Sequence, residues 1–516
     1  MERNIHSNET LVFIIQPDKE EFDLVFRLYT QFNSRKLIEN YSILFMPEIT
    51  YEIKIFMRDF CSAIKVYSYH NELVPLDKDI IILNIPNCLK QLYVDGDKNS
   101  LNVMARVLAK IEMLFGIFQH EFVKGDNSKV VNDLLEEEEK VNGINKTSQP
   151  NVIHSCIIME RANDPISPFC SNYTYEGLLD EYFGIKWNKT YVKNSIFSEF
   201  SGGKKEKKVP GKSSDVTGFE VSSNLAFYEK CRSMYFGHAI EFIKESVLEI
   251  QKLKEQTMNE KKDLTLITQN VKKIKEAMKL DLPILEKHFP ILDYISKEKS
   301  KPLARQMLKQ EQFLITLQPF KSLHEFYDNL IGVKGDLYNL LRIMCLESLT
   351  QDGIMNYNKI KKDIILTYGF QKVFLLNNLE KAGFLRPKEE NIFSLGLMKK
   401  KIEKANSDLS IDYSSVFSKL NLFNEEFNLN DIKDCSYVYL SYKSISLKMI
   451  ESAVEGNWKK IADGLKKIPG AQIFPPSPEQ VRASKKPEKN FIFAAFIGGI
   501  TYAEIEGIRF LNKIMP

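Results

Sequence analysis

The first part of the chain alternates between short apolar runs and longer stretches in which apolar side chains recur every three or four positions. The short runs lie at residues 11–15, 41–45 and 80–83, and they are typical of buried parallel strands. The longer stretches, at residues 19–32 and 101–118, have the spacing of helices with one apolar face. This alternation predicts an α/β domain with a parallel sheet.

Ser100 stands where it would cap the helix predicted over residues 101–118. A linker is predicted over residues 136–150, where a run of glutamates is followed by Gly, Asn, Ser and Pro. A new apolar strand pattern then covers residues 152–159. We therefore expect a first α/β domain over residues 1–141, followed by a second one.

The middle of the chain has almost wholly helical spacing, from residue 224 to residue 349. Apolar side chains between residues 239 and 253 form one stripe, and a polar stretch follows at residues 258–262. A second helix is predicted over residues 264–278, so the pair predicts a helical hairpin. The same stripe would also suit the core of any helical domain. Helical spacing continues over residues 330–385.

Strand patterns return near the C-terminal end. Residues 437–440 resemble a short strand, and residues 468–490 are rich in Pro, Lys and Ser, as loops are. Residues 491–497 form a strongly apolar strand pattern, followed by two glycines and a helix from Thr501. A strand, a turn and a helix after a long helical insert predict that the chain returns to its second α/β domain.

The predicted fold class is therefore α/β with a large helical insert. The domains expected are an N-terminal α/β domain over residues 1–141, a discontinuous second α/β domain over residues 150–222 and 490–516, a helical domain with the hairpin over residues 223–330, and a mixed helical domain over residues 331–489.

Charge and hydropathy narrow the classes of function. The chain has 516 residues with 71 Lys and Arg against 68 Asp and Glu, so its net charge of +3 favours neither nucleic acid nor an anionic membrane. The N-terminus lacks the basic and apolar regions of a signal peptide. The most apolar stretch, residues 491–503, is shorter than the about 20 residues that span a bilayer. Any membrane contact is expected to be peripheral.

The cysteines and histidines do not form metal-binding patterns. The seven cysteines are widely spaced and lack a C-x-x-C pair, which favours free thiols in a reducing compartment. The histidines form neither H-x-x-x-H nor H-E-x-x-H, so no metal site is predicted. The cysteines are Cys61, Cys88, Cys156, Cys170, Cys231, Cys345 and Cys435.

Motifs for catalysis or cofactor binding are equally scarce. The chain has no Walker A loop, no G-x-G-x-x-G and no G-x-S-x-G. The turn at Gly498 and Gly499 opens a helix, where a phosphate can bind, although paired glycines more often serve close packing. Asp95 and Asp97 flank a glycine, as in ordinary turns. We predict no catalytic residue and no cofactor.

A polar pattern after the strand at residues 152–159 is more specific. Residues 157–185 resemble the signature of the Sec/Munc (SM) family, in which an acidic residue and an arginine end a strand, Asp and Pro follow, and T-Y-E-G-L-x-D-E opens a helix. The matching residues are Arg161, Asp164, Pro168, Thr174, Tyr175, Glu176, Asp180 and Glu181.

Three further stretches resemble the vacuolar sorting branch of that family, in the family's order along the chain. They are residues 73–77 with 92–97, residues 379–385, and residues 496–505 with 509–511; the last contains Gly498, Gly499 and Glu504. The family's first strand and helix have no counterpart here, and the family usually continues beyond Pro516. The first sheet is therefore expected to have an unpaired edge.

The resemblance implies an arch of two α/β domains and a helical third domain, in a protein that is not an enzyme. It implies binding of syntaxin-type and R-SNARE proteins, whose assembly it would promote or proofread during endosome-to-vacuole or lysosome fusion. It also implies membership of a HOPS or CORVET tethering complex, docked to a subunit resembling vacuolar protein sorting-associated protein 16. The expected location is cytoplasmic, peripherally on late endosomes, vacuoles or lysosomes.

Candidate contact residues follow from the same resemblance. On the hairpin, SNARE contacts are expected at Lys252, Lys254, Glu255, Lys262 and Asp263, although a solvated charged face would have the same composition. Docking to the tether subunit is expected on a helix over residues 361–376, where Phe370 and Val373 would share one face with Lys361 nearby. Buried core packing is the alternative for these apolar residues.

Two other functions stay open. One is a structural tether scaffold that makes no SNARE contact, and the other is a nucleotide-dependent enzyme that uses the glycine turn.

Overall fold

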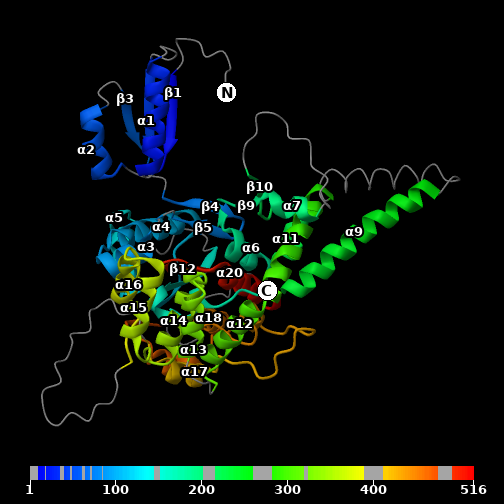
Figure 1. Cartoon of the computed structure of the whole chain (residues 1–516). Coiled ribbons are helices and arrows are strands. Elements are labelled where there is room, and N and C mark those ends of the chain that lie inside the picture. Colours follow the sequence, from blue (N-terminus) through cyan, green and yellow to red (C-terminus); the bar gives the residue numbers. More distant parts are fainter. Residues whose placement is uncertain are drawn as a thin grey trace, which may run out of the picture. The chain divides into compact units, whose positions relative to one another are not determined.

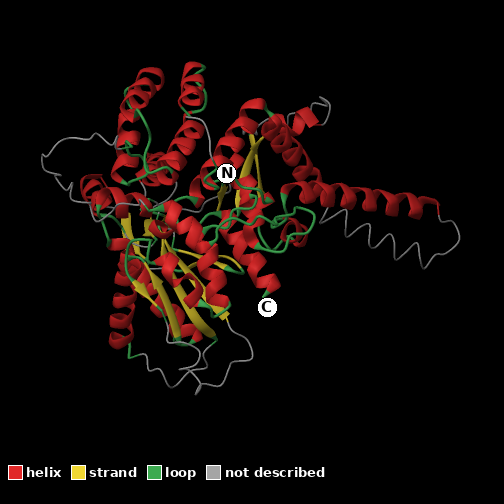
Figure 2. Ribbon diagram, turned by 90° about the horizontal axis from the view of Figure 1, so that it is seen from below, coloured by secondary structure: helices red, strands yellow, loops and turns green. Residues whose placement is uncertain are grey.

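A computed structural model gives the fold as two compact units, residues 1–86 and residues 87–516, and each is described by itself (Figures 1 and 2). The structure describes residues 10–17, 19–34, 40–46, 49–60, 64–69, 72–83, 85, 87–143, 152–200, 215–259, 282–318, 323–388, 411–474 and 491–515.

The first unit contains a three-stranded parallel sheet in the order β1-β2-β3, which confirms the predicted strands at residues 11–15 and 41–45. Phe22 and Val25 of α1 pack against Ile43 and Phe45 of β2, so one face of the sheet is buried by helices. β1 lies at an edge of the described sheet, as expected. The elements are β1 (Thr10–Ile15), α1 (Lys19–Ser34), β2 (Asn40–Phe45), α2 (Tyr51–Phe60) and β3 (Ile64–Ser68).

The strand predicted at residues 80–83 belongs to a hairpin and not to this parallel sheet. β4 (Val74–Asp77) and β5 (Ile80–Ile82) pair in antiparallel fashion, with Asp77 opposite Ile80. Only two residues separate these partners, and a connection that short can join only antiparallel strands.

The second unit is built around a four-stranded sheet in the order β11-β6-β7-β12. β6 (His120–Lys124), β7 (Ile153–Glu160) and β12 (Phe491–Ile497) run parallel, and β11 (Gln472–Ile473) is antiparallel to β6. The pairing of β12 with β7 brings the chain back, after the helical insert, to the sheet that contains residues 153–160. Figure 2 shows helices on both sides of these strands.

The boundary predicted at residue 141 is wrong, because residues 87–141 belong to the second unit. β6 was missed since it begins and ends with polar residues. Its last residue, Lys124, is nevertheless buried, and its ammonium donates to the carbonyl oxygens of Ile468 (2.7 Å) and Gly470 (3.0 Å). The predicted linker is also partly helical, because α5 (Asp126–Val141) continues through its glutamates.

The long helix before β6 is present as α4 (Asn99–Phe115), but Ser100 does not cap it. Ser100 lies inside the helix and is buried. The backbone N–H of Asn99 instead donates to Asp97 at 2.9 Å, which confirms the turn chemistry predicted for that aspartate.

The described residues between 224 and 349 are mostly helical, as predicted. Residues 437–440, which resemble a strand, instead lie in or next to a 3₁₀ helix, η4. The remaining elements of the second unit are α3 (Cys88–Lys90), η1 (Gln91–Asp95), η2 (Arg161–Asn163), η3 (Ser167–Phe169), α6 (Tyr175–Phe183), β8 (Ile185–Lys186), β9 (Lys189–Lys193), α7 (Asn194–Phe200), β10 (Val216–Glu220), α8 (Ala226–Cys231), α9 (Phe236–Asn259), α11 (Leu282–Ser300), α12 (Pro302–Ile315), α13 (His324–Gly332), α14 (Leu337–Thr350), α15 (Tyr357–Tyr368), α16 (Lys372–Lys381), α17 (Tyr413–Leu420), η4 (Cys435–Tyr439), α18 (Ile445–Val454), α19 (Trp458–Leu465) and α20 (Tyr502–Ile514).

The predicted hairpin is described in part. Its first helix is α9, which starts on the body of the unit and extends away from it (Figure 1). Its predicted second helix, residues 264–278, lies outside the described residues. α9 and α11 pack together at the base, and we call this pair the arm. Among the described residues, no helix is long and apolar enough to cross a membrane.

The base of the arm is an aromatic core that encloses one histidine. Ala239 and Ile243 of α9 and Ile291 of α11 are fully buried there with residues of α6 and α8. The ring of His288 accepts or donates a short hydrogen bond with the hydroxyl of Tyr175, and its other nitrogen is buried without a partner. Burial lowers the pKa of His288 from 6.5 to about 3, so the ring is neutral in the folded protein.

His288 should make the fold sensitive to acid. The unfolded chain takes up a proton below pH 6.5 and the folded chain does not, so stability present above pH 6.5 is lost as the pH falls from 6.5 towards 3. The loss is about 1.4 kcal/mol per pH unit. We expect His288→Gln to flatten the dependence of the free energy of unfolding on pH between 6 and 4.5, measured by urea titration. Equal slopes in the two proteins would contradict this.

Candidate functional site

The centre of the signature is a buried ion pair between Arg161 and Glu504. Arg161 begins η2 directly after β7, and Glu504 lies in the first turn of α20. The two guanidinium nitrogens donate to the two carboxylate oxygens at 3.0 and 2.7 Å. The side chains are only 3% and 0% exposed. Burial alone would raise the pKa of Glu504, but the guanidinium outweighs it and holds the pKa below its usual range.

Local chemistry explains why Glu504 stands there. Thr501 caps α20, and the Glu504 carboxylate accepts the backbone N–H of Thr501 at 2.9 Å in a capping box. Gly498 and Gly499 have φ angles of 89° and 98°, which glycine adopts readily, so the chain can turn sharply from β12 into the helix. A Cβ atom at Gly498 would lie 3.2 Å from Cβ of Arg161, so this glycine also permits the close approach.

Asp164 extends the network into the helical insert. Its carboxylate accepts the N–H of Ser167 at 3.1 Å and the backbone N–H of Ser446, in α18, at 3.0 Å. The hydroxyl of Ser446 lies 2.6 Å from Glu504. Pro168 is at the start of η3, where its lack of an N–H costs nothing. The signature therefore ties the sheet to α18 as well as to α20.

A second buried group joins α6 to α20. Glu176 accepts from Arg509 at 2.6 Å and from the hydroxyl of Tyr228 at 3.0 Å, and Arg509 also contacts Glu506 at 2.5 Å. Burial, together with Glu506, raises the pKa of Glu176 well above its usual value. The positive charges of Arg509 and Arg232 oppose this rise in part.

The last two signature acids act at the C-terminal end of α6. Asp180 accepts the backbone N–H of Ile185 at 2.9 Å and so closes the turn after the helix. Glu181 forms an ion pair with Arg342 of α14 at 3.0 Å. Burial would raise the pKa of Glu181, but Arg342 outweighs it and the pKa is lowered. The charged residues of the signature, Arg161, Asp164, Glu176, Asp180 and Glu181, therefore all make structural contacts within the fold.

The carboxyl edge of the parallel sheet is where α/β folds commonly bind phosphates. Here that edge is filled by the protein's own carboxylates. Glu504 occupies the start of α20, and Glu160 occupies the start of α5, where it accepts from Asn127 (2.6 Å) and Tyr93 (3.0 Å). A Cβ atom at Gly125 would overlap Glu160. These contacts argue against the nucleotide-dependent alternative at the glycine turn.

One group of carboxylates within the described ranges is close enough to hold a cation: Glu112, Glu121 and Glu139. Its ligand atoms lie within 4.8 Å of one another. Burial raises the pKa of Glu112 to about 8, with Glu139 and Glu121 adding to the effect. This shift favours the protonated, neutral form of Glu112, which makes the group a poorer ligand set for a cation. This group was not predicted from the sequence, because its members come from three different elements.

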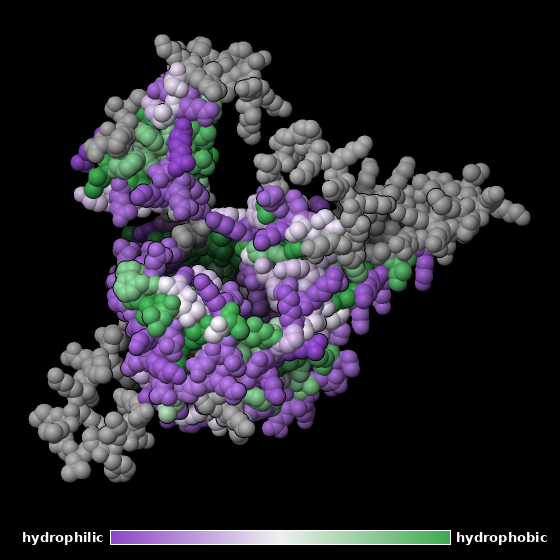
Figure 3. Space-filling view, in the orientation of Figure 1, coloured by the Kyte–Doolittle hydropathy of each residue, from purple (hydrophilic) through white to green (hydrophobic). Residues whose placement is uncertain are grey.

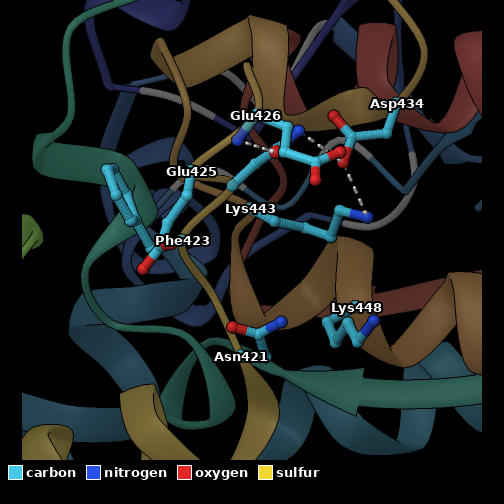
Figure 4. Close-up of a pocket in the computed structure, with 8 residues that line it drawn as sticks. Asn421, Phe423, Glu425, Glu426, Asp434, Lys443 and Lys448 are labelled. Atoms are coloured by element: carbon cyan, nitrogen blue, oxygen red, sulfur yellow. Dashed lines mark hydrogen bonds and ion pairs between the residues drawn. The ribbon is translucent and has the colours of Figure 1, made fainter.

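A polar pocket of about 470 Å³ lies beside α18 (Figure 4). The buried ammonium of Lys443 contacts Asp434 at 3.2 Å and Glu451 at 2.8 Å, and Lys448 contacts Glu451 at 2.9 Å. The positive charges of Lys443 and Lys448 are therefore already paired. The exposed side chains of Glu425 and Glu426, which also line the pocket, suit a cationic group. The lining residues are Asn421, Phe423, Asn424, Glu425, Glu426, Asp434, Lys443 and Lys448.

The predicted SNARE-contact residues are only partly described. Lys252 is exposed on α9. Lys254 and Glu255 lie within α9, but their side chains are outside the described part, as are Lys262 and Asp263 altogether. The structure therefore places one of these side chains on the surface of the arm.

The predicted docking helix is two helices. Gly369, with a φ angle of 100°, ends α15, and Val373 lies half-buried in the first turn of α16. Phe370 lies between the helices and is 74% exposed, so the core alternative is wrong for this residue. Lys361 is not a free surface charge, because it bridges the helices through Glu380 (2.6 Å) and Asn377 (3.0 Å).

Two further exposed apolar side chains accompany Phe370. Leu366, at the end of α15, is 73% exposed, and Phe374, in α16, is 71% exposed. Figure 3 shows apolar side chains gathered over α15 and α16. These two residues were not predicted from the sequence, although the three recur at intervals of four. We call Leu366, Phe370 and Phe374 the apolar patch.

A model of the Sec1 family matches residues 2–515. This chain belongs to the Sec1 family. It is 30% identical over 460 residues to the vacuolar protein-sorting-associated protein 33 homolog of Arabidopsis thaliana, covering 85% of this chain and 71% of that protein. It is 25% identical to vacuolar protein sorting-associated protein 33A of Rattus norvegicus, covering 98% of this chain and 82% of that protein.

Solved structures share the fold at low identity. The Unc18–syntaxin 1 complex from Monosiga brevicollis matches with a TM-score of 0.58 and 14% identity, covering 99% of this chain and 84% of that one. The SM protein Vps45 in complex with the Qa SNARE Tlg2 matches with a TM-score of 0.54 and 13% identity, covering 98% of this chain and 81% of that one. The predicted Sec/Munc fold class is therefore confirmed.

In this Sec1-family chain, Arg161→Met should be severely destabilising. It leaves the Glu504 carboxylate buried without its cation, and such losses cost about 3–5 kcal/mol. Chemical denaturation would measure the free energy of unfolding. Replacing both partners by methionine should recover part of the loss, because no charge then stays buried.

Lys90→Met is the matched control for that substitution. It removes the exposed Lys90–Asp95 pair, with side chains 52% and 43% exposed, so it should have little effect. Comparable losses in the two variants would show that burial of the Arg161–Glu504 pair is unimportant.

Proposed function

We propose that this Sec1-family chain binds SNARE proteins and promotes or proofreads their assembly during fusion of endosomes with the vacuole or lysosome. In this proposal it acts as a subunit of a HOPS- or CORVET-type tether, in the cytoplasm and peripherally on late endosomal, vacuolar or lysosomal membranes. SNARE partners of both the syntaxin type and the R type would be bound.

The observation that carries the proposal is the match along nearly the whole chain to vacuolar sorting relatives. Two solved structures with the same fold contain a syntaxin or a Qa SNARE, as their descriptions state. The buried signature network of this chain supports the same scaffold, since it joins β7, α6, α18 and α20.

The arm supplies a physical route to SNARE assembly. SNARE motifs that are disordered before binding lose conformational entropy when they become helical and align. A rigid helix with mixed polar and apolar positions would hold such a motif by helix-in-groove packing. Aligning two motifs in advance lowers the ordering cost of their encounter. α9 extends from the body of the unit and presents Lys252 to solvent, as this role requires.

Charge reversal on the arm should weaken SNARE capture. In a pull-down with purified syntaxin-type and R-type SNARE motifs, we expect Lys252→Glu combined with Lys254→Glu to reduce capture severalfold and to make it less sensitive to salt. Lys513→Glu, on the exposed end of α20, is the matched control. Capture that is unchanged by reversals at Lys252, Lys254, Glu255, Lys262 and Asp263 would exclude this map of the contact.

We further propose that the apolar patch docks a tether subunit resembling vacuolar protein sorting-associated protein 16. Its three side chains are each more than two-thirds exposed, an unusual arrangement for large apolar groups in neighbouring turns. The Lys361–Glu380 pair holds α15 against α16 and so keeps the patch in place. The patch also favours the second candidate function, a tether scaffold without SNARE contact.

Phe370→Asp should abolish co-purification with that subunit and leave helical content unchanged, because the side chain contributes little to the core. Affinity purification and circular dichroism measure the two effects. Leu303→Asp, at an exposed apolar position in the first turn of α12, is the control and should retain the partner. A Phe370→Asp protein that keeps its helical content and still co-purifies with the subunit would exclude this docking contact.

Binding to the tether subunit but to neither class of SNARE motif would favour the scaffold.

A further inference from the structure

The segment over residues 171–175 leads from η3 into α6, and its last three residues are hydrogen-bonded to the residues at and just before the start of α9. The backbone N–H of Phe236 donates to the carbonyl of Tyr173 at 2.9 Å, and the N–H of Tyr175 donates to the carbonyl of Met234 at 3.1 Å. Thr174 and Tyr235 form an antiparallel bridge between these bonds. Because these are backbone contacts, they fix the position at which α9 leaves the body of the unit.

The same segment holds α11, the other helix of the arm, at two places. Tyr175 hydrogen-bonds His288 within the aromatic core. At the C-terminal end of α11, the ammonium of Lys299 lies 3.4 Å from the carbonyl oxygen of Asn172 and 4.9 Å from the ring centre of Tyr173. Contacts near both ends of the described α11 restrict its tilt as well as its position.

A buried charge cluster holds the segment from behind. Glu311 of α12 accepts both the N–H and the hydroxyl of Ser171 at 2.7 Å. Arg342 of α14 donates to that hydroxyl at 3.1 Å and pairs with Glu181 at 3.0 Å. Glu181 in turn accepts the backbone N–H of Asn172 at 3.1 Å. The segment is thus fixed on one side to the arm and on the other to α12 and α14.

We infer that residues 171–181 form the socket of the arm, and that Arg342 is the positioning residue that keeps the socket closed. Glu311 is 1% exposed, whereas Arg342 and Glu181 are 18% and 21% exposed. Lys299 also attracts both carboxylates, but Arg342 forms an ion pair with each of them, at 3.0 Å from Glu181 and 3.7 Å from Glu311. Its removal leaves Glu311 buried and Glu181 without its partner, so the segment must shift or take up water, and both arm helices lose their support.

The value of this socket for SNARE assembly rests on the proposed function, because a loose arm presents no fixed groove. The SM signature then has a physical role. Arg161 and Asp164 tie the sheet to α20 and α18, and Glu181, the last acid of the signature, supports the arm.

Hydrogen exchange tests the socket without a SNARE. In the full chain carrying Arg342→Gln, we expect backbone amides at the start of α9 and in α11 to exchange about tenfold faster or more, with the sheet β6-β7-β12 unchanged. Arg342→Lys should restore protection in part, because a lysine keeps the charge but not the two-pronged geometry. Arg386→Gln, which removes the ion pair with Asp352 beyond the other end of α14, is the matched control.

Unchanged exchange in α9 and α11 of a folded Arg342→Gln protein would overturn the socket. If that variant does not fold, Lys299→Met replaces it, since it leaves Arg342, Glu181 and Glu311 in place. It should speed exchange in α11 more than in α12, and equal exchange in α11 with and without Lys299 would likewise overturn the inference.

SNARE capture by the same variants separates this inference from the proposed function. Faster exchange in the arm with a matching loss of capture supports both. Faster exchange with full capture leaves the socket standing and removes the arm from SNARE binding. Unchanged exchange, with capture intact in the wild-type chain, removes only the socket.

Discussion

Arg161 and Glu504 are 343 positions apart in the sequence, and they meet inside the protein as a two-pronged ion pair. Taking both charges out of water is costly unless each finds its partner and the remaining hydrogen bonds are made. The capping box of α20 and the hydroxyl of Ser446 supply further hydrogen bonds to the Glu504 carboxylate, whereas Nε of Arg161 is buried without a hydrogen-bond partner. The whole insert between β7 and β12 must therefore fold so that its two ends come together.

This requirement also decides what the α/β unit can do. In related architectures the carboxyl edge of a parallel sheet and the adjoining helix starts receive phosphates. Here Glu160 and Glu504 accept the hydrogen bonds that a phosphate would take. In this chain, side chains at that edge instead join the sheet to α18 and α20. In the proposed function, the groups that face partners are carried by helices away from the sheet, in the arm and in the apolar patch.

The three charge groups of the signature differ in burial, and their difference suits different tasks. The pair at Arg161 is closed to water, whereas the pair between Arg342 and Glu181 is partly open to it. A closed pair favours a single arrangement of the sheet and α20. A partly open pair costs less to break, so the contact of Arg342 with Glu181 should give way more easily than that of Arg161 with Glu504.

Local pattern was sufficient for much of this fold. The strands at residues 11–15 and 491–497 and the helical insert were predictable, because periodic burial acts over a few positions. The signature around Arg161 was identified by its resemblance to the SM family. Only the tertiary structure decided the rest. Lys124 lies in a buried strand because the carbonyls of Ile468 and Gly470 receive its ammonium.

In the same way, Lys361 is an internal bridge because Glu380 lies beside it, and Phe370 is exposed because Gly369 ends α15. The partners of Arg161 and Glu181, namely Glu504 and Arg342, come from helices far along the chain. From the sequence alone, a charged side chain is expected to lie at the surface. Its burial depends on an ion-pair or hydrogen-bond partner that only folding brings near.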